Sequence, residues 1–424
     1  MSGDLNDIIN SEIHSVFKDF SIKSHYCPED INSRDFDARI RLISEKIFNA
    51  CKLKKSSETL SRNKISIVMS TVYNSGGHTP LALNIIDLLK EKFNLFFHLL
   101  DQDSLSALSD NKQEALKQHA SIININKYQQ KDFIGKILHS YLNLISCKAS
   151  TIFALIHPDD IVHAIVFNLL KMTHNLKIIF INHADHKINL GMNSSDLIID
   201  FRSVGAQATN ISRGYYNNLV LNFPISSNTR KGLAEKQAVR KVLGLSSCKK
   251  ISITACSPYK IYTNCQDYFL MIKSLLEKNQ DLTHLLNDGI GVNKSKARSI
   301  INNENLFQRI VFRDMSDNYE DYFQCANVFI DSFFQGSALT HVDCMRLGLP
   351  TVVKINNKEP LKSFQDYLPF GYKYMSSNTN ELENIIHNIL NDTQLQDEIS
   401  KDNLEWFNSI YKQTNLFSQY SNLI

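Results

Sequence analysis

The sequence predicts an α/β protein of two doubly wound parallel sheets that face a cleft, preceded by a helical segment. Three observations support this. The chain has 424 residues, more than one hydrophobic core usually holds, so two domains are expected. Two blocks of short, unalternated apolar runs are separated by amphipathic stretches, which is the pattern of parallel strands covered by helices on both faces. A polar, basic stretch separates the two blocks.

The net charge, the cysteine spacing and the lengths of the apolar runs limit which classes of protein this chain can belong to. Hydrophobic residues make up 43% and charged residues 21% of the chain, and the net charge of +3 is too small to indicate a nucleic-acid partner. The eight cysteines show no CxxC pair and no zinc spacing, so we expect free thiols in a reducing compartment. No signal-peptide core and no apolar run of about 18 residues is present, which predicts a cytoplasmic protein with at most a peripheral membrane contact.

The first part of the chain predicts a helical segment and then a domain. Residues 1–60 read as helices, with apolar residues close to a 3.6-residue period from Phe36 onward. Residues 61–228 form the first Rossmann-like domain. Its predicted strands are 65–72, 94–101, 120–126, 150–156, 176–182, 195–201 and 218–224.

The second part repeats the pattern. A linker helix is expected over 229–249, a second Rossmann-like domain over 250–400 and a final helix over 401–424. Ligands of such sheets bind outside the carboxyl ends of the strands, so functional residues are sought there. The predicted strands of this domain are 251–257, 281–288, 309–314, 327–333 and 349–355.

The stretch "YNSGGHTP", residues 73–80, follows the first strand and precedes a helix. Gly76 and Gly77 bare the backbone, Thr79 is a plausible N-cap and Pro80 suits a first helical turn. The helix amides would then face a ligand rich in oxyanions or hydroxyls; a plain tight turn explains the glycines equally well. The pattern is neither GxGxxG nor GxxxxGK[ST], so dinucleotide and P-loop sites are not expected.

The stretch "DSFFQGSALTHVDCMRLGLP", residues 331–350, carries the sharper pattern. Gly336 and Ser337 predict a turn after a strand, and the helix after it stops at Gly348. Thr340 and Asp343 are three residues apart and share one helix face. In this arrangement a phosphate can bind at the N-terminus of the helix. One turn later, the carboxylate of Asp343 can accept hydrogen bonds from a ribose diol.

This motif resembles the donor-binding signature of GT-B glycosyltransferases, whose usual form is Glu-Ala-Met-x-x-Gly-x-Pro. Asp343 stands where Glu is commoner, and the Thr340-x-x-Asp343 version is more similar to the O-GlcNAc-transferase-like branch, which includes bacterial protein N-glycosyltransferases. By architecture the resemblance covers residues 61–424, and by motif it is specific over 327–353. Residues 1–60 lack the tetratricopeptide period of the animal-type enzymes. The resemblance implies an acceptor-side first domain and a second domain that binds a nucleotide-sugar.

The loop "ACSPYKIY" follows the first strand of the second domain. In similar enzymes a basic residue here neutralises the donor diphosphate, and a lysine with a helix N-terminus can do so without a metal. An exposed surface lysine is the alternative. We therefore expect a UDP-sugar as co-substrate, with no metal and no other cofactor. The candidate donor residues are Tyr259, Lys260, Gly336, Ser337, Thr340 and Asp343.

The stretch "INHADHKINLG", residues 181–191, places two histidines beside an acid. His183 or His186, steered by Asp185, can act as general base toward an acceptor hydroxyl, and His78 is the rival. A structural turn is equally compatible, whereas a metal site is disfavoured because the HExxH spacing is absent. Arg202 can meet an anionic acceptor or form a salt bridge. The candidate acceptor residues are Gly76, Gly77, His186 and Arg202.

The sequence thus predicts a metal-independent glycosyltransferase that acts on a surface glycan, a lipid-linked saccharide or a protein. A nucleotide-sugar epimerase of the same fold and a non-catalytic sugar- or nucleotide-binding partner remain alternatives. The Asn-, Lys- and Ile-rich composition is typical of AT-rich bacterial genomes.

Overall fold

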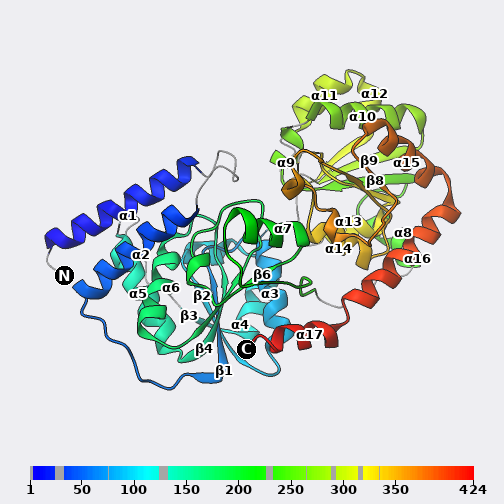
Figure 1. Ribbon diagram of the computed structural model, residues 1–424. Helices are drawn as coiled ribbons and strands as arrows, with labels where there is room; N and C mark the ends of the chain where they lie inside the picture. The colour runs from blue at the N-terminus through cyan, green and yellow to red at the C-terminus, as the bar shows by residue number, and fades with distance from the viewer. Residues whose placement is uncertain are drawn as a thin grey trace. The chain divides into compact units, whose positions relative to one another are not determined.

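The computed structural model divides the chain into two compact units. The first comprises residues 1–74, 78–226 and 413–424, and the second comprises 75–77 and 227–412. Each unit contains one parallel sheet (Figure 1). The residues that the structure describes are 3–23, 33–74, 76–123, 132–225, 233–263, 265–287, 293–313, 319–333 and 335–424.

The first unit is built on a seven-stranded sheet in the order β3-β2-β1-β4-β5-β6-β7, with all neighbours parallel. Ile67 sits between Phe97 and Phe153 in register, and all three are fully buried. The strand order reverses between β1 and β4, which is the switch point where such sheets bind ligands. The strands are β1 Ser61–Met69, β2 Asn94–Leu99, β3 Ser121–Ile123, β4 Ala149–Leu155, β5 Lys177–Ile181, β6 Leu197–Asp200 and β7 Asn218–Val220.

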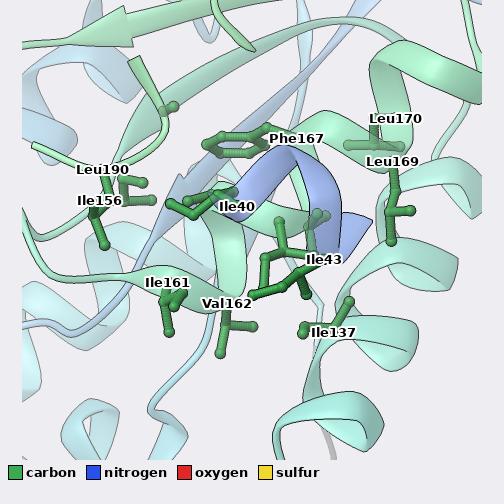
Figure 2. Packing of buried hydrophobic residues seen from close by; sticks show 14 of the residues in the cluster. Ile40, Ile43, Ile137, Ile156, Ile161, Val162, Phe167, Leu169, Leu170 and Leu190 are labelled. Carbon is green, nitrogen blue, oxygen red and sulfur yellow. The ribbon is translucent and has the colours of Figure 1, made fainter. Parts of the chain in front are cut away.

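Helices supply the rest of this core. Figure 2 shows Ile40 and Ile43 of α2 lying among buried side chains of α5 and α6. α1 packs in turn on α2, so the N-terminal helices extend the core of the first unit. Leu42, also in α2, lies on the outer side of the helix and is 54% exposed. The helices of this unit are α1 Gly3–Lys23, α2 Ser33–Ala50, α3 His78–Leu89, α4 Asp110–His119, α5 Phe133–Ser146, α6 Ile161–Thr173, α7 Ser203–Gln207 and α17 Gln413–Ser421.

The second unit has a six-stranded parallel sheet in the order β10-β9-β8-β11-β12-β13, which reverses between β8 and β11. Its strands are β8 Lys250–Ala255, β9 Leu282–Asn287, β10 Ile310–Arg313, β11 Val328–Ile330, β12 Thr351–Lys354 and β13 Met375–Ser376. Its helices are α8 Leu233–Val242, α9 Tyr259–Tyr262, α10 Cys265–Lys278, α11 Lys294–Ile301, α12 Glu304–Phe307, α13 Tyr319–Cys325, α14 Leu339–Arg346, α15 Thr379–Asn391 and α16 Thr393–Ile410.

The predicted fold class is confirmed: two Rossmann-like α/β sheets preceded by helices. Each of the twelve predicted runs overlaps a strand, and among the strands of the described residues only β13 was not anticipated. The helix expected over 229–249 corresponds to α8, although residues 226–232 lie outside the described residues. The end of the chain forms α16 and α17 rather than one helix over 401–424.

Two further features concern the described residues only. The seven cysteines among them are free thiols. None of their helices combines the length and apolarity needed to cross a bilayer.

Candidate active site

The glycine loop after β1 is shaped by one left-handed residue. Gly76 has φ +91°, a conformation that only glycine adopts readily; Gly77 is exposed and outside that region. α3 begins at His78, one residue before the predicted cap, and the Thr79 hydroxyl accepts the N–H of Tyr73 at 2.7 Å. Thr79 therefore closes the loop from inside the helix.

A column of rings, here called the histidine stack, lies at the carboxyl edge of this sheet. It consists of Tyr73, His157, His78 and His183. The ring centroids of His78 and His183 are 4.2 Å apart, those of His78 and His157 are 5.1 Å apart, and those of Tyr73 and His157 are 5.5 Å apart. His157 was not singled out from the sequence. Its position just after β4, across the switch point from the glycine loop, is the signal that identifies it.

The stack is held in the neutral state. Burial, with the neighbouring imidazoles His183 and His157, lowers the pKa of His78 well below its ordinary value. Burial and His157 lower the pKa of His183 to about 3, and burial also lowers the pKa of His157. Each of the three imidazole rings therefore has a lone-pair nitrogen at neutral pH.

Hydrogen bonds select the tautomers of the two candidate bases. The Nε2 of His78 donates to the carbonyl oxygen of Leu155 at 2.8 Å, and its buried Nδ1 has no hydrogen-bond partner among the residues that the structure describes. The Nδ1 of His183 lies 3.4 Å from the carbonyl oxygen of Ile181, so Nε2 carries the lone pair. Of the two rings, only His183 thus has its lone pair on the nitrogen farther from the backbone.

Asp185 and Arg202 form a buried pair. The Arg202 Nε and Nη2 atoms donate to the two carboxylate oxygens of Asp185 at 2.5 and 2.7 Å, and the exposed fractions are 1% for Arg202 and 4% for Asp185. A Cβ on Gly205 would lie 2.3 Å from Asp185 Oδ2, so only glycine leaves room for the pair. His186 Nδ1 is 4.0 Å from Asp185 Oδ1.

This pairing bears on two candidate assignments from the sequence. The salt bridge considered for Arg202 is present, and its guanidinium is too buried to reach an acceptor in this conformation. The carboxylate suggested to steer His183 instead fixes Arg202. His186 lies at the edge of this pair, outside the stack.

In the second unit, a hydrogen bond joins the loop after β8 to the turn after β11. The ammonium of Lys260 donates to the Gly336 carbonyl oxygen at 2.9 Å, and the Gly336 N–H donates to Lys362 O at 3.0 Å. A Cβ on Gly336 would lie 2.8 Å from Asp331 Oδ2 and 3.2 Å from Phe364 Cδ2, which explains the glycine. These two loops flank the switch point of the six-stranded sheet.

Lys260 is not the freely solvated lysine considered as an alternative. It is half-buried, its ammonium lies 5.8 Å from the centre of the Phe364 ring, and burial lowers its pKa, opposed by Cys256 and Asp331. Tyr259 beside it is 49% exposed. Lys260 is therefore a positioned cation at the carboxyl edge of the sheet.

Helix α14 presents its N-terminus at the same edge. The N–H of Ser337 is taken by Asp331 Oδ1 at 3.1 Å, so the amides of the Gly336–Ser337 turn are both engaged within the protein. The candidate donors for a phosphate here are therefore the first amides of α14, those of Leu339 and Thr340, which have no acceptor within the helix itself. Asp343 lies one turn later and is 8% exposed, and its Oδ1 is 3.3 Å from Arg346 Nη2.

Two parallel α/β sheets, one in each unit, are the architecture of the GT-B fold. Among solved structures, the chain is similar to Anabaena HepE in complex with UDP and glucose (TM-score 0.66, 13% identity, 85% of this chain and 99% of that chain). It is also similar to a mutant of the O-GlcNAc transferase of Thermobaculum terrenum (0.64, 9%, 97% and 76%). A third similar structure is a mutant of S. aureus TarM in complex with fondaparinux, alpha-GlcNAc-glycerol and UDP (0.62, 11%, 85% and 99%).

These structures confirm the predicted GT-B fold. No family model matches the chain, and no curated protein matches it in sequence.

Proposed function

We propose that the chain is a metal-independent glycosyltransferase that moves a sugar from a UDP-sugar to an acceptor. The observation that carries the proposal is the fixed ammonium of Lys260 on the Gly336 carbonyl, at the sheet switch point beside the N-terminus of α14. Structural neighbours with this fold hold UDP or UDP-glucose.

The donor chemistry follows from these groups. As the bond between the anomeric carbon and the diphosphate oxygen breaks, negative charge develops on the leaving diphosphate. Lys260 and the first amides of α14 are donors preorganised to stabilise that charge. Thr340 and Asp343 on the same helix face are proposed to hold the ribose, and Tyr259 to cover the nucleotide.

The acceptor is proposed to bind the first unit. His183, whose Nε2 carries the lone pair, accepts the proton or hydrogen bond of the attacking hydroxyl. His78 supports it by stacking, at 4.2 Å between ring centroids. Among the acceptor classes predicted from the sequence, we favour a saccharide, because neighbouring structures include a lipopolysaccharide galactosyltransferase and the complex of TarM with fondaparinux.

The first test is thermal stabilisation by UDP, GDP, ADP, TDP and CMP. Ligands of the folded state raise the melting temperature by mass action, so we expect a selective rise with UDP that is clearly smaller in Lys260→Ala and in Asp343→Ala. Lys250→Ala is the matched control, because Lys250 is a half-buried, hydrogen-bonded lysine at the opposite end of β8.

Product analysis then separates the alternatives. A transferase releases UDP as sugar appears on the acceptor, an epimerase returns a changed nucleotide-sugar, and a binding partner does neither. Absence of stabilisation by every nucleotide would overturn the proposal.

A further inference from the structure

Asp331 and His341 form a fully buried pair behind the turn at the end of β11. Both side chains are 0% exposed, and His341 Nε2 lies 3.1 Å from Asp331 Oδ2. This is a close contact without hydrogen-bond geometry, and neither atom has a hydrogen-bond partner among the described residues. The Phe329 ring packs edge-on against His341, with 6.1 Å between the ring centroids. Neither residue has a role in the proposed donor site, and a buried carboxylate is costly unless it is paired.

The carboxylate of Asp331 organises the turn that holds Lys260. Its Oδ1 accepts the N–H of Ser337 at 3.1 Å, and its Oδ2 lies where a Cβ on Gly336 would be only 2.8 Å away. The backbone of Asp331 is anchored separately, by its N–H donating to Val352 O at 2.9 Å. The carbonyl of Gly336 in this turn is the one that accepts the Lys260 ammonium at 2.9 Å.

We propose that Asp331 and His341 are a positioning pair for the donor site. Asp331 fixes the turn and thereby Lys260, and the close contact with His341 keeps the Asp331 carboxylate from attracting the lysine ammonium. The proposal rests on the proposed function, because it assigns these residues to the same donor site. The negative charge of Asp331 acts on Lys260 and raises its pKa, against the larger lowering by burial. Removing His341 therefore leaves that carboxylate free to draw the ammonium away from the diphosphate seat.

A double-mutant cycle tests the action through Lys260. Asp331→Asn retains the size of the side chain and an oxygen for the Ser337 N–H but removes the charge. We expect UDP to bind this variant about tenfold more weakly, because a neutral amide oxygen holds the Ser337 N–H, and with it the turn that carries the Gly336 carbonyl, less tightly than the carboxylate does. In the Lys260→Ala background the same change should alter UDP affinity by less than about twofold, because the residue through which it acts is gone. Equal effects in both backgrounds would overturn the proposal.

A matched control separates positioning from stability. His284 is also a fully buried histidine of the second unit, bound to Ser252 Oγ at 2.9 Å and to the Tyr268 hydroxyl at 2.8 Å. We expect His284→Gln to lower the melting temperature without changing the UDP affinity of the folded protein. An equal loss of UDP affinity in this control would show that any buried defect suffices, contrary to the proposal.

A direct readout follows the lysine itself. The rate at which an amine-acylating reagent modifies Lys260, measured by mass spectrometry, should rise at least threefold in Asp331→Asn and stay unchanged in His284→Gln. An unchanged rate in Asp331→Asn contradicts the proposal. This measurement needs no nucleotide, so it still tests the positioning if UDP fails to bind the wild type and the proposed function is wrong.

The partner residue gives the converse test. His341→Phe should weaken UDP binding more than Asp331→Asn does, because it strands a buried carboxylate beside Lys260. Combining the two changes should restore affinity to the level of Asp331→Asn alone. A double variant that binds UDP no better than His341→Phe would contradict the pairing.

Discussion

At the scale of single residues, the neutral state of His183 has a measurable consequence. Its pKa is about 3 in the folded chain, below the ordinary value of 6.5. The unfolded state binds more protons between these values, so the stability that His183 contributes is complete above pH 6.5 and lost as the pH falls toward 3. As the pH is lowered through this window, the free energy of unfolding should fall less steeply in His183→Gln than in the wild type. The difference in slope should be up to about 1.4 kcal/mol per pH unit.

Urea unfolding at a series of pH values measures this slope. Above pH 7 the wild type and His183→Gln should show the same pH dependence, which provides an internal control. Identical slopes between pH 4.5 and 6.5 would show that His183 is not held neutral by the fold.

The choice of base is also a prediction about single residues. His183→Ala should lower the kcat of sugar transfer by about a hundredfold, as for loss of a general base, while UDP affinity stays unchanged. His78→Ala should have a smaller effect, because its Nε2 is bound to the Leu155 carbonyl. His98→Gln, a buried histidine of the same unit, is the control. Unchanged turnover in both His183→Ala and His78→Ala would refute the assignment.

At the scale of elements, α8 and α14 end in the same way and allow a matched comparison. After α14, the N–H groups of Gly348 and Leu349 donate to Met345 O and Cys344 O at 3.0 and 2.8 Å, which is a Schellman motif. After α8, Gly244 and the residue that follows it repeat the two bonds at 3.2 and 2.7 Å. The two glycines have φ +59° and +70°.

The surroundings of the two glycines differ, and this sets the prediction. A Cβ on Gly348 would lie 2.7 Å from Ser400 Oγ and 3.0 Å from Leu404 Cγ, whereas one on Gly244 would meet nothing within 4 Å. Gly244→Ala should therefore destabilise by about 1 kcal/mol, the strain of the left-handed backbone alone. Gly348→Ala should destabilise by clearly more, measured by urea unfolding. Equal destabilisation by Gly244→Ala and Gly348→Ala would show that α16 moves aside without cost.

The same scale explains what the sequence could predict. Strands were recognisable because each buried strand is an unalternated apolar run of several residues; β13, with only two residues, has no such signal. The helix stop at Gly348 was predictable because the left-handed turn depends on one residue type. The pairs Asp185–Arg202 and Asp331–His341 were not, because they depend on side-chain directions in the folded unit rather than on local pattern.

At the scale of the whole molecule, the last helix returns to the unit in which the chain begins. α17 follows the second unit in sequence, but Leu416 and Tyr420 are fully buried in the first. The Tyr420 hydroxyl donates to Asn222 O at 3.0 Å, and Lys177 Nζ donates to Leu423 O at 2.6 Å. The last residues therefore complete the first core.

Because α17 belongs to the first unit, a substitution in α17 should destabilise the first unit rather than the second. Calorimetry with and without UDP should identify the transition of the second unit, because that unit holds the proposed UDP site and a bound ligand raises the melting temperature by mass action. Leu416→Ala should lower the other transition, by an amount equivalent to about 2–5 kcal/mol for a buried leucine. Leu390→Ala, 2% exposed in the core of the second unit, should lower the UDP-sensitive transition instead. If Leu416→Ala lowered only the UDP-sensitive transition, α17 would be stabilising the unit that precedes it in sequence rather than the one on which it packs.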